Sequence, residues 1–158
     1  MEMRRKDRKV TDFTVILSVI DKCKSLRLGL NDDGEVYIVP LSFGYEHEGE
    51  KLTFYFHGAR EGRKYDVMRK NPAAGFELDC DVIPTGEGDI PCVYGSKFAS
   101  IIGNGTCSLI EDTDEKIHAL KALMKHQTGR DFEFSPEMTN GVNVFRLETS
   151  SYSCKIRA

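Results

Sequence analysis

Residues 26–43 have the sequence LRLGLNDDGEVYIVPLSF, in which two short apolar runs flank a polar turn. The runs are Leu26–Leu30 and Val36–Phe43, and Asn31–Gly34 separates them. An Asp-Gly turn between apolar runs is a strong hairpin signal, so we expect two antiparallel strands here. Another apolar run, Leu52–His57, follows the polar, turn-like segment Glu46–Glu50. Together these segments predict a three-stranded antiparallel meander.

Three further segments have helical patterns. Asp12 is a suitable N-cap for an apolar-rich segment that ends near Cys23. Residues 61–71 predict a short helix that Pro72 stops. Residues 112–126 begin with a capping-box pattern and continue with one apolar stripe, as in an amphipathic helix packed on a core.

The remaining apolar segments predict strands, and a loop rich in proline and glycine is expected between two of them, at Val82–Val93. Six or seven mostly antiparallel strands with three helices indicate a mainly β (α+β) protein. This order fits a small Greek-key-like barrel better than an alternating α/β sheet. The predicted later strands are Ala73–Asp81, Phe98–Ile110, Val142–Glu148 and Tyr152–Ile156.

The composition is that of one globular domain spanning residues 1–158, with 40% hydrophobic and 30% charged residues. A net charge of −3 gives no general attraction to nucleic acid or to an anionic membrane. No segment approaches the roughly 18 apolar residues that a membrane helix needs. No two of the five cysteines have C-x-x-C spacing, so we expect no metal site. Their odd number, with no apolar signal-peptide core, leads us to expect reduced thiols and a cytoplasmic location.

Residues 54–65, FYFHGAREGRKY, contain the most informative chemistry. A strand ends, two glycines loosen the turn, and a helix begins among Arg60, Arg63 and Lys64. Cations at a helix N-terminus oppose the helix dipole, and a bound phosphate would remove that conflict. The cluster therefore predicts a phosphate site, and a solvated basic helix face is the alternative.

Two neighbouring features add to this hypothesis. His57 ends the strand before the turn and could donate a proton or anchor a substrate, although a hydrogen-bonded histidine at a strand end is equally consistent. Pro40, within Val39–Ser42, lacks the N–H that a central strand would donate. Its strand therefore lies at an edge of the sheet or faces a ligand.

Other enzyme classes are disfavoured by absent motifs. The chain has no G-x-x-x-x-G-K-[ST] phosphate loop, no G-x-G-x-x-G dinucleotide fingerprint and no G-x-S-x-G elbow.

In order along nearly the whole chain, short motifs resemble the pyridoxamine-phosphate-oxidase-like FMN-binding split-barrel family, and especially its nitroimidazole-resistance (Nim-type) branch. Each motif is weakly specific alone, and the ordered set is quite specific. The motifs are Arg4–Arg8, Arg27–Leu30, Tyr37–Glu46, Tyr55–Ala59, Gly62–Lys64, Asn71-Pro72, Phe76-Glu77, Ser100–Gly103 with Gly105, and Glu115–Leu120 without a match at its third and fourth positions.

The resemblance implies a homodimer of split β-barrels with FMN at the interface. It implies that Gly62, Arg63 and Lys64 form the phosphate site, with the two basic side chains holding the phosphate. Phe56 and His57 would lie beside the ring and the ribityl chain, and Ser100 would supply a polar contact, often from the neighbouring subunit. The backbone that would line the isoalloxazine ring belongs to Ile38, Val39, Pro40, Leu41 and Ser42.

The chain also differs from the family pattern. Phe98 and Ala99 stand where relatives often have Tyr-Arg, and the C-terminus, Ser151–Ala158, lacks the Arg-x-His with which pyridoxamine phosphate oxidases hold their substrate. We therefore do not expect vitamin B6 synthesis. We expect an FMN-dependent oxidoreductase that reduces a small oxidised compound such as a nitroaromatic, with His57 as proton donor. The alternatives are a non-enzymatic flavin or haem protein for storage or redox sensing, and an interaction module without a cofactor.

Overall fold

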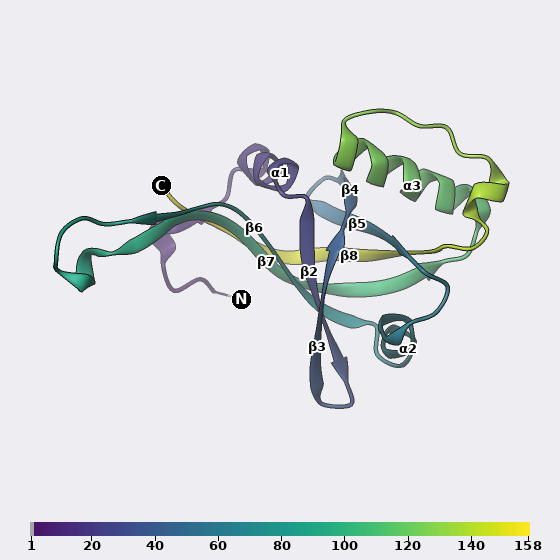
Figure 1. Cartoon of the computed structure of the whole chain (residues 1–158), viewed down its shortest axis with the longest axis horizontal. Coiled ribbons are helices and arrows are strands. Elements are labelled where there is room, and N and C mark those ends of the chain that lie inside the picture. The colour runs from purple at the N-terminus through teal and green to yellow at the C-terminus, as the bar shows by residue number, and fades with distance from the viewer. Residues whose placement is uncertain (1) are drawn as a thin grey trace.

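A computed structural model describes residues 2–158 as one eight-stranded antiparallel sheet with helices around it (Figure 1). The sheet order is β3-β2-β6-β7-β8-β5-β4, and β1 pairs with β8. This confirms the expected mainly β architecture with flanking helices. The strands are β1 (Lys9–Val10), β2 (Ser25–Asp32), β3 (Glu35–Ser42), β4 (Gly44–Glu48), β5 (Lys51–Gly58), β6 (Ala73–Thr85), β7 (Gly95–Ile110) and β8 (Asn143–Arg157).

The two hairpins of the first half, β2–β3 and β4–β5, lie at opposite ends of the sheet order. The predicted meander is therefore wrong. Glu46–Glu50 was expected to be a turn, but most of it belongs to β4, and Phe43 alone separates β4 from β3. The chain bends at Phe43, which is fully buried, so the two ends of the sheet order meet at this corner.

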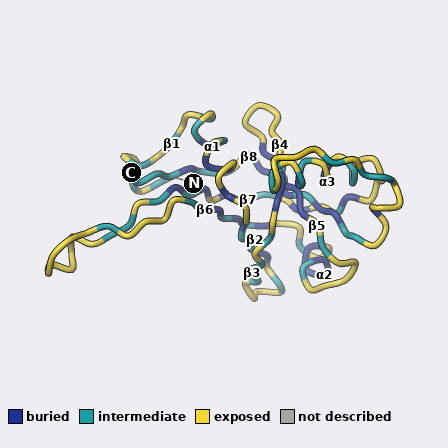
Figure 2. The backbone as a smooth tube through the Cα atoms, turned by 45° about the horizontal axis from the view of Figure 1, so that its top comes forward, coloured by how far each residue is buried: buried dark blue, intermediate teal, exposed yellow. Residues whose placement is uncertain are grey.

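The strands β6, β7 and β8 form the long centre of the sheet. β6 and β7 extend beyond the barrel as an arm whose tip includes the short 3-10 turn Pro91–Val93 (Figure 1). Figure 2 shows that most of this arm is exposed. The two strands expected at the C-terminus are one continuous strand, β8, which pairs with β5 and with β7.

Three α-helices cover the barrel, as the sequence predicts. They are α1 (Phe13–Lys22), α2 (Arg63–Lys70) and α3 (Thr113–Thr128), and short 3-10 turns lie at Lys6–Arg8 and Pro136–Thr139. The predicted caps of two helices are present. Asp12 accepts from the Thr14 N–H at 2.9 Å, and Asp112 accepts from the Glu115 N–H at 3.0 Å.

The barrel interior holds the main hydrophobic core, which includes Ile20, Leu28, Phe54 and Phe76. A second, smaller cluster lies between α3 and the outer side of β5, around Tyr55 and Leu120. Gly44 permits this contact, because a Cβ there would clash with the backbone of α3 at Leu123. The core thus fixes the positions of β5 and of the turn that follows it.

No helix within residues 2–158 is long and apolar enough to cross a membrane.

Candidate functional site: the opening turn of α2

The opening turn of α2 follows directly from the C-terminal end of β5. Gly62 precedes the helix, and among the described residues no side chain caps its N-terminus. The N–H groups of Tyr65 and Asp66 point back to the carbonyl of Gly62, at 3.2 and 3.4 Å. The earlier N–H groups of a helix have no intrahelical acceptor, so this turn offers donors to an anion.

Lys64 and Tyr65 form the centre of the site. The ammonium nitrogen of Lys64 lies 5.0 Å from the centroid of the Tyr65 ring. The Tyr65 hydroxyl is buried and has no hydrogen-bond partner within residues 2–158. Burial raises the pKa of Tyr65, so the hydroxyl remains protonated and can donate. A buried donor without an acceptor costs free energy, so this geometry favours an acceptor from outside the chain.

Gly58, at the end of β5, allows this arrangement. A Cβ at this position would clash with the Tyr65 hydroxyl and would lie 3.2 Å from the ammonium nitrogen of Lys64. Among the described residues, neither Lys64 nor Arg60 has an ion-pair partner. The turn therefore combines two cations without an ion-pair partner and one orphaned hydroxyl, and Asp66 is the acidic residue of the same helical turn.

Arg63 is placed differently from its neighbour. Its guanidinium donates to Asp32 and to Glu35, both at 3.0 Å, and stacks 4.4 Å above the Tyr37 ring. The hydrogen bonds to Glu35 and Asp32 raise the pKa of Arg63. A phosphate would have to compete with both carboxylates for this guanidinium, so Lys64 is the better placed of the two predicted phosphate ligands.

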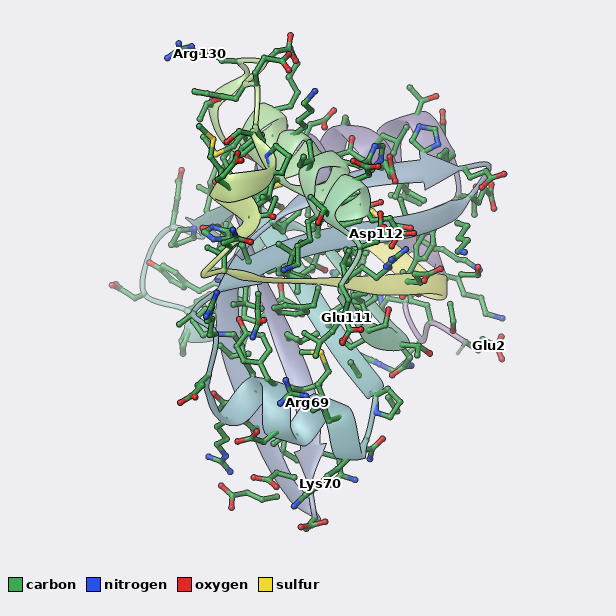
Figure 3. All side chains as sticks on the ribbon, turned by 90° about the vertical axis from the view of Figure 1, so that its right-hand side faces the viewer. Glu2, Arg69, Lys70, Glu111, Asp112 and Arg130 are labelled. Atoms are coloured by element: carbon green, nitrogen blue, oxygen red, sulfur yellow. The ribbon has the colours of Figure 1, made fainter. Side chains whose placement is uncertain are left out.

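The tip of the β2–β3 hairpin lies beside α2, and Figure 3 shows Arg69 and Lys70 at this end of the molecule. Asp32 and Asp33 of the hairpin and Lys70 of the helix line a cavity of about 250 Å³ between them. The Arg63 ion pairs thus hold the hairpin against the helix. They bring the beginning of β3 near the candidate phosphate site at the opening turn of α2.

The predicted ring-lining residues lie along β3, which is the first strand in the sheet order. Pro40 is therefore in an edge strand, one of the two expected situations. Val39 and Leu41 pack against the core, whereas Ile38, Pro40 and Ser42 are exposed on the outer face. The other edge of β3 is unpaired within residues 2–158, so its backbone groups can face a ligand.

Phe56 and His57 point in opposite directions because successive side chains of a strand alternate. The Phe56 ring is fully buried and stacks on Phe145, with ring centroids 4.9 Å apart. Only the backbone of Phe56 can therefore contact a ligand. His57 is exposed and lies on the same face of the sheet as Tyr55 and Val144, whereas Gly58 faces Tyr65 and Lys64 on the opposite side.

Ser100 lies on β7, between Asp79 of β6 and Lys155 of β8, and is half-buried. Three strand spacings separate β7 from β3, which corresponds to about 14 Å. One protomer therefore does not bring Ser100 next to the predicted ring-lining strand.

The family model for pyridoxamine 5'-phosphate oxidase matches residues 14–156. The chain belongs to the pyridoxamine 5'-phosphate oxidase family. The match spans α1 to β8, and it confirms the resemblance that the ordered motifs indicate.

Solved structures with the same fold support this membership. A candidate 5-nitroimidazole antibiotic resistance protein from Bacteroides thetaiotaomicron is 28% identical, with a TM-score of 0.80 over 94% of this chain and 86% of that one. An FAD-binding protein from Mesorhizobium loti is 21% identical, with a TM-score of 0.67 over 96% and 98%. A NimC/NimA family protein from Clostridium acetobutylicum is 16% identical, with a TM-score of 0.56 over 89% and 85%.

The Bacteroides protein agrees with the expected Nim-type branch, and the other two show the shared split-barrel fold alone. Among curated proteins, none matches the chain.

Sequence reasoning did not single out Tyr65 as a donor or Asp32 and Glu35 as partners of Arg63. Tyr65 is in the quoted motif, but its spacing does not reveal that its hydroxyl is buried without a partner. The carboxylates lie in the hairpin turn about 30 residues earlier, where acidic residues are ordinary turn formers.

Proposed function

We propose that this protein binds FMN at the opening turn of α2 and acts as a flavin oxidoreductase. The observation that carries the proposal is the buried Tyr65 hydroxyl, which has no acceptor within residues 2–158 and lies beside the unpaired ammonium of Lys64. A phosphate fits this set, since it accepts hydrogen bonds from a hydroxyl, an ammonium and free helix N–H groups together.

Different residues of this chain would bind the phosphate and the ring of the flavin. Lys64 and the helix N–H groups would hold the phosphate, with Tyr65 donating from inside the barrel. The free edge of β3, from Ile38 to Ser42, would offer backbone groups to the polar rim of the ring. A bound flavin supplies the electron or hydride transfer, and the protein supplies position and electrostatics.

His57 would act on the substrate side. Its exposed imidazole, next to Gly58, would donate a proton to the small molecule that accepts electrons. We propose a nitroaromatic as that molecule, and the similarity to a candidate 5-nitroimidazole resistance protein supports this choice.

We also propose that the active form is a homodimer, because an outer face of the sheet lacks a covering element. Ile38 pairs across the strands with Gly29, Gly29 with Gly75, and Gly75 with Asn104. A Cβ on Gly29 or Gly75 would meet nothing closer than 3.6 Å in the same chain. The fold itself therefore does not require these glycines, and close approach by a second chain or a ligand explains them.

A flavin titration tests the phosphate site. We expect FMN to bind at least about tenfold more tightly than riboflavin, since each charge-assisted hydrogen bond contributes roughly 1.5–3 kcal/mol. Lys64→Ala should weaken FMN binding about ten- to hundredfold and leave riboflavin binding nearly unchanged.

Arg69→Ala is the matched control, because Arg69 is exposed at the other end of the same helix and, within residues 2–158, pairs only with Asp66 at 3.5 Å. It removes the same charge and should leave both affinities unchanged. Equal affinities for FMN and riboflavin would refute the phosphate site. A Soret band after addition of haem, with no flavin uptake, would instead favour the haem-binding alternative.

A further inference from the structure

Two cysteines far apart in the sequence, Cys23 and Cys80, meet where the end of α1 lies against β6. The neighbouring residues fix this contact, because the ammonium of Lys22 lies 2.9 Å from a carboxylate oxygen of Asp81. The two side chains lie close enough for each to change the pKa of the other. The proposed flavin site uses neither thiol.

The backbone holds both thiols in place. The Cys23 N–H donates to the carbonyl of Ile20 at 3.0 Å, and a ring nitrogen of His126 lies 2.7 Å from the Cys23 carbonyl. Cys80 pairs with Ala99 in the β6–β7 ladder, next to a bulge where Asp81 has a φ of 56°. The backbone segments that carry the two cysteines are therefore both anchored.

The surroundings give the two thiols different roles. Burial raises the pKa of both, that of Cys23 to about 12. The Asp81 carboxylate raises the pKa of Cys80 further, whereas Cys23 and the Lys22 ammonium act in the opposite direction. Cys80 is the more accessible of the two thiols. Because a peroxide reaches the more accessible thiol first, Cys80 is the residue that reacts first and Cys23 the one that resolves.

The sheet register excludes Cys154 as the partner of Cys80. Leu78 pairs with Ile101 and Ile101 with Cys154, so β7 lies between the two cysteines. Two strand spacings amount to about 10 Å, beyond the roughly 7 Å between Cα atoms that a disulfide can span.

We propose that Cys23 and Cys80 form an oxidisable dithiol that a hydroperoxide converts to a disulfide. The Cys80 thiolate attacks the terminal peroxide oxygen, the O–O bond breaks, and the alkoxide (hydroxide, if hydrogen peroxide reacts) leaves and takes up a proton. Cys23 then attacks the sulfur of the Cys80 sulfenic acid, the S–S bond forms, and hydroxide leaves with the proton of the Cys23 thiol as water. In total, two thiols and one hydroperoxide give one disulfide, one alcohol and one water.

The experiment uses the full-length Cys92→Ser variant. Cys92 is exposed on the β6–β7 arm, and no lysine or arginine lies between Lys70 and Lys97, so trypsin leaves Cys80 and Cys92 in one peptide. The variant is treated with excess hydrogen peroxide for the time that fully oxidises Cys92 in the unchanged protein. The remaining thiols are then alkylated, and the mass and the non-reduced peptides are measured.

We expect the loss of two hydrogen atoms, a peptide in which Cys23 is joined to Cys80, and reversal by dithiothreitol. Cys154→Ser should form the same link, because this residue lies beyond reach. Cys23→Ser should stop the reaction at a Cys80 sulfenic acid, which dimedone traps. Full alkylation of both Cys23 and Cys80 after the treatment, or a link that joins either one to another cysteine, would overturn the proposal.

Discussion

At the scale of the single residue, the flavin hypothesis depends on one hydroxyl group. Tyr65 is fully buried, and its ring packs edge-on against Phe145 with centroids 5.8 Å apart. That packing accounts for the ring but not for the hydroxyl. A phenylalanine would satisfy the same packing without burying an unpaired donor. A tyrosine is useful here only if something outside the chain accepts its hydrogen bond.

Tyr65→Phe should therefore separate stability from binding. Without flavin, we expect the melting temperature to stay the same or to rise, because the variant removes a polar group without a partner. FMN affinity should fall about ten- to hundredfold, the effect of losing one hydrogen bond of roughly 1.5–3 kcal/mol to a charged group. Thermal unfolding with and without FMN measures both quantities. A lower melting temperature in the flavin-free variant would mean that the hydroxyl serves the fold.

His57→Ala should leave FMN affinity unchanged and slow the reduction of a nitroaromatic by the bound, reduced flavin. Loss of a general acid lowers such a rate by roughly 10²–10⁴-fold. Stopped-flow reoxidation of the reduced protein measures this step. His47→Ala is the matched control, because His47 is also an exposed strand histidine and packs on Phe13, with ring centroids 5.3 Å apart. Equal rates for both variants would remove His57 from the mechanism.

At the scale of the elements, the last turn of α3 is fastened to two distant parts of the chain. The His126 ring packs at a tilt on Phe43, with ring centroids 4.5 Å apart, and one of its nitrogens lies 2.7 Å from the Cys23 carbonyl. The Gln127 amide donates to the carbonyls of Lys24 and Phe43, at 2.9 and 2.8 Å. These contacts join α3 to the end of α1 and to the corner between β3 and β4.

This attachment should weaken as the pH falls. Burial lowers the pKa of His126 below its ordinary value of 6.5. Above that value the imidazole is neutral in both states. Below it the unfolded chain binds a proton that the folded chain resists, so stability declines until the folded value is passed. The melting temperature should therefore drop as the pH falls from about 7 to 5.

His126→Gln should make the melting temperature nearly independent of pH between about 7 and 5. The glutamine amide can donate to the Cys23 carbonyl but does not titrate. His118→Gln is the control for a histidine that is mostly exposed and pairs with Glu46 at 2.8 Å. Identical profiles for the His126→Gln variant and the unchanged protein would show that another group causes the decline.

The sequence predicts elements better than their pairing, and β4 illustrates the physical reason. Hairpin signals, caps and apolar periods are local, so α1, α3 and the β2–β3 hairpin were predictable. Whether β5 pairs with β3 or with β8 depends on contacts between residues about 90 positions apart, such as Phe54 opposite Leu147. The candidate site also combines features that are local in the sequence with contacts that only folding creates. The basic turn was visible, but the carboxylates that bind Arg63 and the orphaned Tyr65 hydroxyl exist only in the folded chain.

At the scale of the whole molecule, apolar surface is left open where a second copy would lie. Ile38 and Ile102 are 61% and 40% exposed on the outer face that also contains Gly29 and Gly75. The β6–β7 arm, most of which is exposed (Figure 2), adds further exposed apolar side chains. Exposed apolar side chains that gather on one face often mark interaction sites in soluble proteins. The exposed apolar side chains on the arm are Val82, Ile83, Ile90, Val93 and Tyr94.

We therefore expect a dimer in sedimentation experiments at micromolar concentration, and Ile102→Asp should convert it to a monomer. Met138→Asp is the matched control, because Met138 is 58% exposed on the short 3-10 turn Pro136–Thr139, outside this face. Ile102 has no predicted contact with flavin. A loss of FMN affinity in the monomeric variant would therefore mean that the second copy completes the site. We expect this result because Ser100, a predicted flavin contact, lies too far from β3 of the same chain. A protein that sediments as a monomer and still binds FMN tightly would contradict the shared site, because all ligands would then have to come from one barrel.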